Sequence, residues 1–315
     1  MAKEGLVIKA ISGFYTVQTN SGQQVICRLP GRLKRKKKAT DIVAVGDWVH
    51  FTQHATNEGL VESVAERRNS LSRVRPSAHN RQLQTDRQQV LVANVDQVIF
   101  VFSLRKPKTH LRKLDRLLAV AEQQKVPAVI CVNKIDLAES GTAEEEFKVY
   151  ADIGYPLVTV SAEKGWGIDK LKAQLDGRVS VFAGSSGVGK SSLLNAIQPG
   201  LGLKTGAVSQ ATTKGMHTTR FAELFKLESS QGGYIADTPG IRGWALYDVE
   251  PDEIDGYFRE IAPLVSLCQF SDCTHLHEPG CAVLAAVENG RVATERYDSY
   301  LRLREEHEAL EDKAY

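Results

Sequence analysis

The sequence has few of the residues that build extracellular or membrane-embedded proteins. Only five of its 315 residues are cysteine, an odd number that is too small for a disulfide framework. No apolar run approaches the roughly 18–20 residues that span a bilayer. Residues 1–10 lack the apolar block and cleavage site of a signal peptide. We therefore expect a cytoplasmic protein in a reducing environment, with no membrane partner.

Net charge is also nearly absent, but the charges are unevenly distributed. The 40 lysines and arginines are almost balanced by 38 aspartates and glutamates. Residues 1–87 carry fifteen basic and seven acidic residues, a net charge of +8, whereas residues 246–315 carry six and sixteen, a net charge of −10. This asymmetry indicates a basic part that meets a polyanion and a separate acidic part. Uneven charge on solvated faces is the alternative interpretation.

The apolar pattern divides the chain into three domains and a linker. Short apolar stretches broken by turn residues predict a small β-barrel or sandwich over residues 1–74. The polar residues 75–87 predict a linker. Strands and helices alternate over residues 88–244, which predicts a doubly wound parallel sheet. Residues 245–315 are acidic and mostly helical, so the fold class is multidomain α/β. The five strands expected in the first domain lie near residues 6–8, 14–17, 25–28, 48–51 and 60–64.

The strongest motif is a complete G-x-x-x-x-G-K-[ST] sequence between a predicted strand and a predicted helix. Glycines let the backbone fold around phosphates, so that N–H groups and the helix N-terminus face the anion. Lys190 would reach the β- and γ-phosphates, and the Ser191 hydroxyl would ligate Mg²⁺. A structural glycine-rich turn is the alternative, but eight matching residues in this context disfavour it. The expected nucleotide-binding residues are Gly184, Ser185, Ser186, Gly187, Val188, Gly189, Lys190, Ser191 and Ser192.

Two loops indicate that the base is guanine. Asn133-Lys134-Ile135-Asp136 follows a buried strand, where α/β folds place ligand-contacting loops. The Asp136 carboxylate can accept hydrogen bonds from the N1–H and the exocyclic amine of guanine, a donor pair that adenine lacks. Ser161 and Ala162 follow the next strand and could offer a backbone N–H to the guanine oxygen. A surface turn would explain the first loop alone, but its pairing with a phosphate loop favours GTP.

Two more segments match the switch regions of GTPases. Asp237-Thr238-Pro239-Gly240 follows an apolar strand. Asp237 can hold Mg²⁺ through water, and the Gly240 N–H can sense the γ-phosphate. Between this motif and the phosphate loop, a threonine hydroxyl can complete the Mg²⁺ shell. We favour Thr219 over Thr218, although spacing does not separate them.

The group that activates water is not the usual one. Ile241 follows Gly240, where Ras-like enzymes carry a glutamine that orients the attacking water. Hydrolysis therefore needs another group or help from a partner. His217 stands beside the switch threonine and is the best candidate, with a surface loop histidine as the alternative.

The order of these motifs is permuted. Ordinary GTPases run from the phosphate loop through the switches to the guanine-reading loops, whereas here the guanine-reading loops come first. A sheet tolerates this order if the old termini are joined and a surface loop is cut. The second switch then leads directly into the C-terminal segment, which could receive a nucleotide-dependent movement.

A cysteine cluster lies within that segment, as Cys268-x₄-Cys273-x-His275-x₅-Cys281. Three thiolates and one imidazole form a closed tetrahedral set suited to one structural Zn²⁺. His277 is a rival ligand to His275, and free thiols near two histidines are the alternative. Cys27 and Cys131 lie in predicted strands and are interpreted as small core residues.

Together these motifs resemble the ribosome small-subunit-dependent GTPase A family. The GSSGVGKS loop, the G-x-H-T-T-R segment, DTPGIR, the cysteine cluster and the permuted order carry a likeness over essentially the whole chain. The resemblance implies an OB-type barrel, a circularly permuted P-loop GTPase and a helical zinc-binding domain. It also implies a GTPase that acts late in maturation of the bacterial small ribosomal subunit, is stimulated by that subunit and contacts its rRNA. We expect a monomer that binds GTP and GDP with Mg²⁺.

The basic run from Arg32 to Lys38 fits an RNA partner. Such a run is usually a solvated loop, but loops of OB barrels carry nucleic-acid contacts, so we expect phosphate binding. Because no aromatic pattern surrounds the run, little base readout is expected. Two other functions remain open: an assembly factor with nucleotide as a structural ligand, and a nucleotide-dependent enzyme acting on a small substrate.

Overall fold

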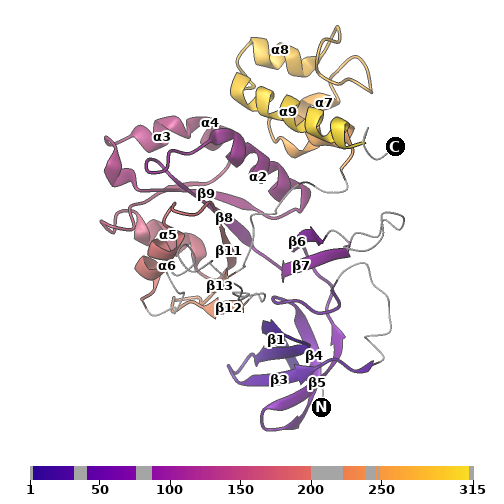
Figure 1. Ribbon diagram of the computed structural model, residues 1–315, viewed down its shortest axis with the longest axis vertical. Helices are drawn as coiled ribbons and strands as arrows, with labels where there is room; N and C mark the ends of the chain where they lie inside the picture. The colour runs from indigo at the N-terminus through magenta and orange to yellow at the C-terminus, as the bar shows by residue number, and fades with distance from the viewer. Residues whose placement is uncertain are drawn as a thin grey trace, which may run out of the picture.

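The computed structural model describes residues 3–31, 41–75, 87–199, 223–237, 246 and 249–311. A strand-rich barrel lies at the N-terminal end, a mixed sheet with helices occupies the middle, and a helical segment lies at the other end (Figure 1). Among the described residues, no helix combines the length and the apolar character that a membrane crossing requires.

The N-terminal barrel closes through five strands. They pair in the order β1-β2-β3-β5-β4, and β4 pairs back with β1. Alternate side chains point inward and form an apolar core that includes Val17, Cys27 and Phe51. This closed five-stranded arrangement confirms the OB-type barrel. The strands are β1 (Lys3–Ile11), β2 (Phe14–Thr19), β3 (Gln24–Arg28), β4 (Trp48–Ala55) and β5 (Glu58–Val64).

A two-stranded hairpin that the sequence did not reveal follows the barrel. β6 (Ser70–Arg75) pairs antiparallel with β7 (Arg87–Ala93). The linker expected at 75–87 thus has strand residues at both ends, and residues 76–86 lie outside the described part of the chain. Polar residues dominate β6 and the start of β7, so the apolar alternation that marks a strand is weak there.

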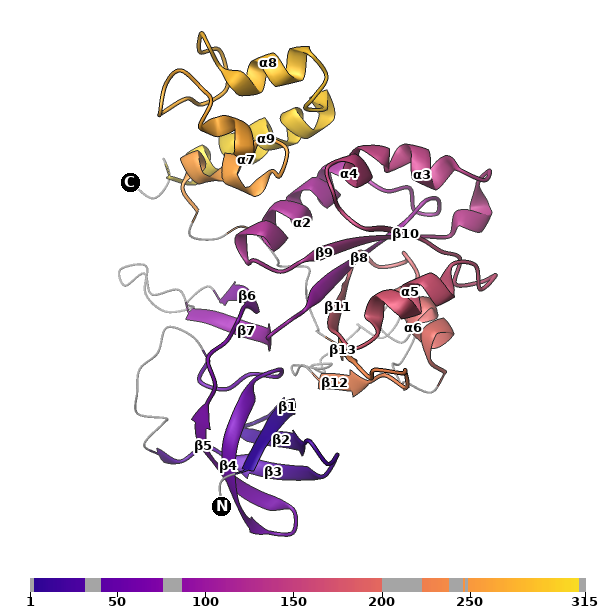
Figure 2. The same ribbon diagram turned by 180° about the vertical axis from the view of Figure 1, so that it is seen from behind.

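The central sheet confirms the predicted doubly wound arrangement of strands and helices. Its strands run in the order β10-β9-β8-β11-β13-β12; neighbours from β10 to β13 are parallel, and β12 is antiparallel. Helices α2, α3 and α4 lie on one side, and α5 and α6 on the other (Figure 2). Every residue of β8 is buried, as expected for a strand covered on both faces. The strands are β8 (Gln97–Ser103), β9 (Ala128–Asn133), β10 (Leu157–Thr159), β11 (Val179–Ala183), β12 (Glu223–Lys226) and β13 (Tyr234–Asp237).

Helices follow these strands at the expected positions. Apolar side chains at helical spacing in α2, such as Leu114 and Leu118, are buried against the sheet. The Glu-rich stretch after β9 forms two short helices rather than one, α3 and α4. The central helices are α2 (Leu111–Gln123), η1 (Ile135–Leu137), α3 (Thr142–Glu146), α4 (Lys148–Asp152), α5 (Ile168–Leu175) and α6 (Lys190–Ile197).

The barrel and the central sheet meet at strands β1 and β12. These strands are antiparallel, with Lys9 opposite Glu223. The Lys9 Nζ lies 2.8 Å from the Glu223 Oε2, and both side chains are about one-third exposed. This pairing joins the strands of the barrel and of the central sheet into a continuous order, and the Tyr234 hydroxyl of β13 adds a hydrogen bond to the Gln18 Oε1 of β2 at 3.4 Å.

The C-terminal segment is helical, as expected, and packs on α2 and α4 through a buried charge cluster. The Arg296 side chain is only 2% exposed; its Nη1 lies 2.8 Å from Asp115 Oδ1, and its Nε lies 2.6 Å from Glu260 Oε1. The Tyr150 hydroxyl also donates to Asp115 at 2.7 Å. The helices are η3 (Pro251–Tyr257), α7 (Ala262–Val265), α8 (Ala282–Glu288) and α9 (Thr294–Glu311).

Arg296→Met should destabilise the protein strongly. The substitution leaves the Asp115 and Glu260 carboxylates buried without their cation, which typically costs about 3–5 kcal/mol of unfolding free energy. Urea unfolding followed by circular dichroism measures the change. Arg302→Met is the matched control, because Arg302 lies exposed on the same helix. Equal stability of the two variants would contradict this account of the interface.

Candidate functional site

The phosphate-loop motif occupies the turn between β11 and α6. Gly189 precedes the helix with φ +93°, and a Cβ atom built there would lie 2.4 Å from the Asn133 Nδ2. Position 189 therefore requires glycine for two reasons: the backbone is left-handed there, and no space is left for a side chain. Lys190 and Ser191 begin the helix, so their backbone N–H groups face the turn.

The Lys190 ammonium lies over this turn. Its Nζ donates to the carbonyl oxygens of Gly184 at 2.7 Å and Ser185 at 2.8 Å. Val188 anchors the loop in the core at 2% exposure, whereas Ser186 and Gly187 are exposed. A half-buried ammonium beside a helix N-terminus can bind phosphate oxygens.

Asn133 joins three segments that the sequence predicted separately. Its side chain is 1% exposed and lies at the end of β9. Its Nδ2 donates to the Val188 carbonyl at 2.9 Å, and its Oδ1 accepts from the Ala162 N–H at 3.1 Å. The Lys134 Nζ adds a hydrogen bond to the Gly187 carbonyl at 2.7 Å. The predicted guanine-reading loops and the predicted phosphate loop therefore meet at one edge of the sheet.

The expected guanine acceptor is held by the loop after β10. The Ser161 hydroxyl donates to the Asp136 Oδ1 at 2.5 Å and accepts the Lys164 N–H at 3.1 Å. The Ile135 N–H is bonded to the Val160 carbonyl at 3.3 Å, so η1 is tied to the same loop. These bonds orient the half-buried Asp136 carboxylate.

The switch residues are only partly within the described structure. Asp237 ends β13, which runs beside the phosphate-loop strand with Ala236 opposite Val181. Thr218, Thr219, His217, Gly240 and Ile241 lie outside the described residues. Among the predicted magnesium ligands, Ser191 alone has a described side chain, and it lies in the first turn of α6.

A lysine that no sequence motif marks lies beside the phosphate loop. Lys113, in the first turn of α2, donates from its Nζ to the Ser185 hydroxyl at 2.8 Å. The Lys134 Nζ also donates to the Lys106 carbonyl, which brings the segment before α2 to the loop. No motif marks Lys113, because α2 is separated from the phosphate loop by more than sixty residues of chain.

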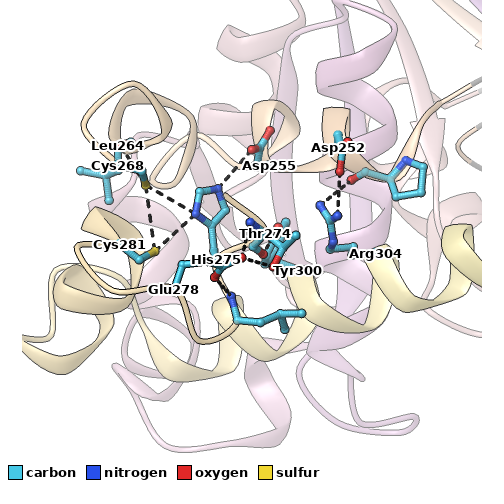
Figure 3. Close-up of polar contacts among 12 residues, drawn as sticks. Asp252, Asp255, Leu264, Cys268, Thr274, His275, Glu278, Cys281, Tyr300 and Arg304 are labelled. Carbon is cyan, nitrogen blue, oxygen red and sulfur yellow. Dashed lines mark hydrogen bonds and ion pairs between the residues drawn. The ribbon is translucent and has the colours of Figure 1, made fainter. Parts of the chain in front are cut away.

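The cysteine cluster forms a compact set of metal-ligand atoms. One atom each from Cys268, Cys273, His275 and Cys281 lies within 4.8 Å of the others. The His275 Nδ1 lies 3.6 Å from the Cys268 Sγ and 3.4 Å from the Cys281 Sγ (Figure 3). Three sulfurs and one imidazole nitrogen suit a tetrahedral Zn²⁺ site, so these residues fit the expected metal.

A carboxylate behind the histidine supports this geometry. The His275 Nε2 lies 3.2 Å from the Asp255 Oδ2, which leaves Nδ1 facing the thiols. Carboxylates in this position fix the tautomer and orientation of metal-bound histidines. His277 is exposed and is not among the clustered residues. The structure therefore brings His275, and not its rival, to the cluster.

Glu278 organises the loop that carries His275. Its carboxylate accepts from the N–H groups of Thr274 at 2.7 Å, Leu276 at 2.9 Å and His277 at 3.0 Å, and from the Thr274 hydroxyl. Burial alone would raise the pKa of Glu278, but the hydrogen bonds, led by those from Thr274, hold this pKa below its usual range. The carboxylate therefore stays charged and keeps the loop closed.

The other two cysteines are core residues, as expected. Both side chains are fully buried, Cys27 in the barrel and Cys131 in β9. Burial raises the pKa of Cys27 to about 11 and the pKa of Cys131 to about 12, so both thiols remain protonated near neutral pH.

Gly189→Ala should weaken GTP binding by about 10-fold or more, or about 1.4 kcal/mol. The added Cβ would displace the Asn133 amide that holds the three loops together. Titration with a fluorescent GTP analogue measures the affinity. Gly141→Ala is the control, because Gly141 has a similar φ of +87° but open space around it. Equal affinities in both variants would show that the contact with Asn133 is unimportant.

Asp255→Asn should weaken metal binding by about 10-fold, because the charge that supports the His275 ring is lost. Transfer of zinc from the protein to a chromogenic chelator measures this affinity. His277→Ala should leave it unchanged. A larger loss in His277→Ala than in Asp255→Asn would reverse the assignment of the imidazole ligand.

Comparison with known proteins agrees with this architecture. A model of the RsgA N-terminal domain matches residues 4–61, and a model of the RsgA GTPase matches residues 64–247. A Bacteroides thetaiotaomicron protein named small ribosomal subunit biogenesis GTPase RsgA 2 is 40% identical over 309 residues, 97% of each chain. A Moorella thermoacetica protein named small ribosomal subunit biogenesis GTPase RsgA is 44% identical over 298 residues, 95% of each chain.

Two solved structures have the same fold over nearly the whole chain. YjeQ from Thermotoga maritima is 36% identical, with a TM-score of 0.78 over 98% of this chain and 99% of its own. YloQ, described as a circularly permuted GTPase, is 32% identical, with a TM-score of 0.75 over 98% of this chain and 96% of its own. With the permuted sheet and the converging nucleotide loops, these matches show that the chain is a GTP-hydrolysing enzyme of the RsgA GTPase family.

Proposed function

We propose that this chain acts in biogenesis of the small ribosomal subunit, binding the immature subunit with GTP and leaving it after hydrolysis. The observation that carries the proposal is the convergence of the phosphate loop and both guanine-reading loops on Asn133. Relatives that match nearly the whole chain carry the name of a small ribosomal subunit biogenesis GTPase. If the subunit stimulates hydrolysis, the chain would leave the subunit only after it has bound there and hydrolysed its GTP.

In this proposal the described residues bind and orient the nucleotide. The Lys190 ammonium and the N-terminus of α6 hold the phosphates, while Asp136 accepts hydrogen bonds from guanine. Asn133 fixes the distance between these two regions, because its amide is bonded to both loops. Ser161 keeps the Asp136 carboxylate oriented.

Magnesium would be held by Ser191, by Thr219 and, through water, by Asp237. The ion when bound neutralises charge on the phosphates and holds them in place. His217 would orient the attacking water, because Ile241 carries no polar group at the position of the Ras-like glutamine. These assignments rest on the motifs, with the position of Ser191 and the end of β13 in accord with them.

The domain division assigns a role to each end of the chain. We infer an RNA-binding barrel over residues 1–74, the GTPase over 88–244 and a zinc-binding domain over 245–315. Residues 75–87, whose two ends belong to β6 and β7, connect the first two. The basic run Arg32–Lys38 supports rRNA binding by the barrel, and the thiol-rich donor set supports Zn²⁺ in the last domain. We also propose that this chain is a monomer that acts in the cytoplasm on its ribosomal substrate.

GTP turnover with and without small ribosomal subunits tests the proposal. The wild-type chain should hydrolyse GTP slowly alone and at least about 10-fold faster with subunits, since factors that complete a GTPase site give such gains. Lys190→Ala should abolish the stimulation, because it removes the charge that binds the phosphates.

Lys170→Ala is the matched control, because Lys170 is exposed on α5. It should behave as the wild-type chain does. Absence of stimulation in the wild-type chain would contradict the proposal. Equal release from subunits with GTP and with a non-hydrolysable analogue would favour a structural role for the nucleotide.

A further inference from the structure

A cavity of about 600 Å³ opens on the outer face of the barrel. Its lining comes from all five strands, chiefly β2, β3 and β5, and from Asn57 in the loop that connects β4 to β5. In OB barrels the face of strands 2 and 3 and the loop between strands 4 and 5 are among the places where oligonucleotides bind. The volume lies within the range of pockets that enclose small ligands.

The wall of this cavity is unusually apolar for the outside of a barrel. Phe14 is 43% exposed, Ile26 is 49% exposed and Ile11 is 38% exposed. Strand alternation explains the positions of Phe14 and Ile26, because Val17 and Cys27 on the same strands point into the core. Such a group of exposed apolar residues indicates a binding surface.

An arginine lies on the aromatic ring of this wall. The Arg28 guanidinium carbon is 4.7 Å from the centre of the Phe14 ring, and these residues are directly opposite in the β2–β3 pairing. An aromatic ring beside an arginine is a common binding platform for nucleic acids. The flat face of a base can stack on the ring, and a nearby phosphate can pair with the guanidinium. The two side chains can therefore serve the base and the backbone of the same nucleotide.

Polar groups at the rim fit a nucleotide better than an apolar peptide. His54, Asn57 and Glu58 line the cavity and supply donors and acceptors for base edges. The charges there are Arg28, Lys9, which is paired with Glu223, and the Glu58 carboxylate. Residues 1–64 as a whole carry nine basic and five acidic residues, so the barrel complements a polyanion.

We propose that this cavity is a binding site for one unpaired RNA nucleotide, whose base stacks on Phe14 and whose phosphate pairs with Arg28. The proposal rests on the proposed function, which supplies RNA as the partner, and it names the part of the RNA that the barrel takes. It differs from the expectation of pure backbone binding, because an exposed aromatic ring selects unstacked bases over duplex.

Binding of a short unstructured RNA and of a duplex of the same composition to the full chain tests the proposal. Fluorescence anisotropy measures both affinities. Phe14→Ala should bind the single strand about 10-fold more weakly, while the duplex affinity changes little. Phe14→Tyr should bind the single strand as the wild-type chain does, because it keeps an aromatic ring. Trp166→Ala should also bind normally, because the exposed Trp166 ring lies in the GTPase domain.

Salt dependence separates the two contacts. Arg28→Ala should lower the slope of log affinity against log salt by about one, because one phosphate contact is lost. Phe14→Ala should keep the wild-type slope. A folded Phe14→Ala protein that binds the single strand as the wild-type does would overturn the proposal, as would equal losses for single strand and duplex or no single-strand binding by the wild-type chain.

Two further readouts distinguish other outcomes. If Phe14→Ala keeps its RNA affinity but binds small ribosomal subunits more weakly, a protein segment occupies the cavity and the RNA proposal is wrong. GTP turnover without subunits should be unchanged in Phe14→Ala. Failure of subunit stimulation in the wild-type chain would contradict the proposed function while leaving the measured single-strand preference intact.

Discussion

The predicted nucleotide site depends on one buried amide. The Asn133 side chain donates to the phosphate loop and accepts from the loop after β10, with 1% of its surface exposed. An amide is suited to this position because it carries a donor and an acceptor on one small rigid group. Loss of the amide would leave the Val188 carbonyl and the Ala162 N–H without these partners, and unsatisfied buried polar groups are costly. Gly189 must lack a side chain so that this amide can approach.

Helix α2 connects the site to the C-terminal domain. Lys113 in its first turn bonds the phosphate-loop residue Ser185, and two residues later Asp115 enters the buried cluster with Arg296. The sequence suggested that movement would reach the C-terminal segment through the second switch. The structure adds a connection through packed side chains of α2, where apolar residues of both domains form one core. Burial makes such ion pairs sensitive to geometry, because their charges are shielded from water.

The C-terminal domain combines this interface with a site that can hold a metal. Short helices and loops over residues 251–288 carry the thiols and the imidazole, whose ligand atoms lie together in one cluster. Asp255 comes from η3 and contacts the ring of His275, so the first helix of the domain is tied to the ligand loop. Glu278 closes that loop by accepting backbone hydrogen bonds. The domain thus combines these polar contacts with the apolar packing of residues such as Ile254, Phe258 and Val283.

Local sequence determined the elements that depend on neighbouring residues. The five barrel strands, the buried strand β8, the phosphate loop and the three cysteines of the cluster could be predicted, because periodicity, turn chemistry and motif spacing act over short stretches, whereas the choice of His275 over His277 needed the folded loop. Tertiary structure alone decided the contacts between distant segments: Lys113 on the phosphate loop, Asp255 behind His275, the β6–β7 hairpin, and Phe14 beside Arg28 on the barrel face. No spacing rule marks these pairs, because strand register and helix packing bring them together only when the whole chain has folded.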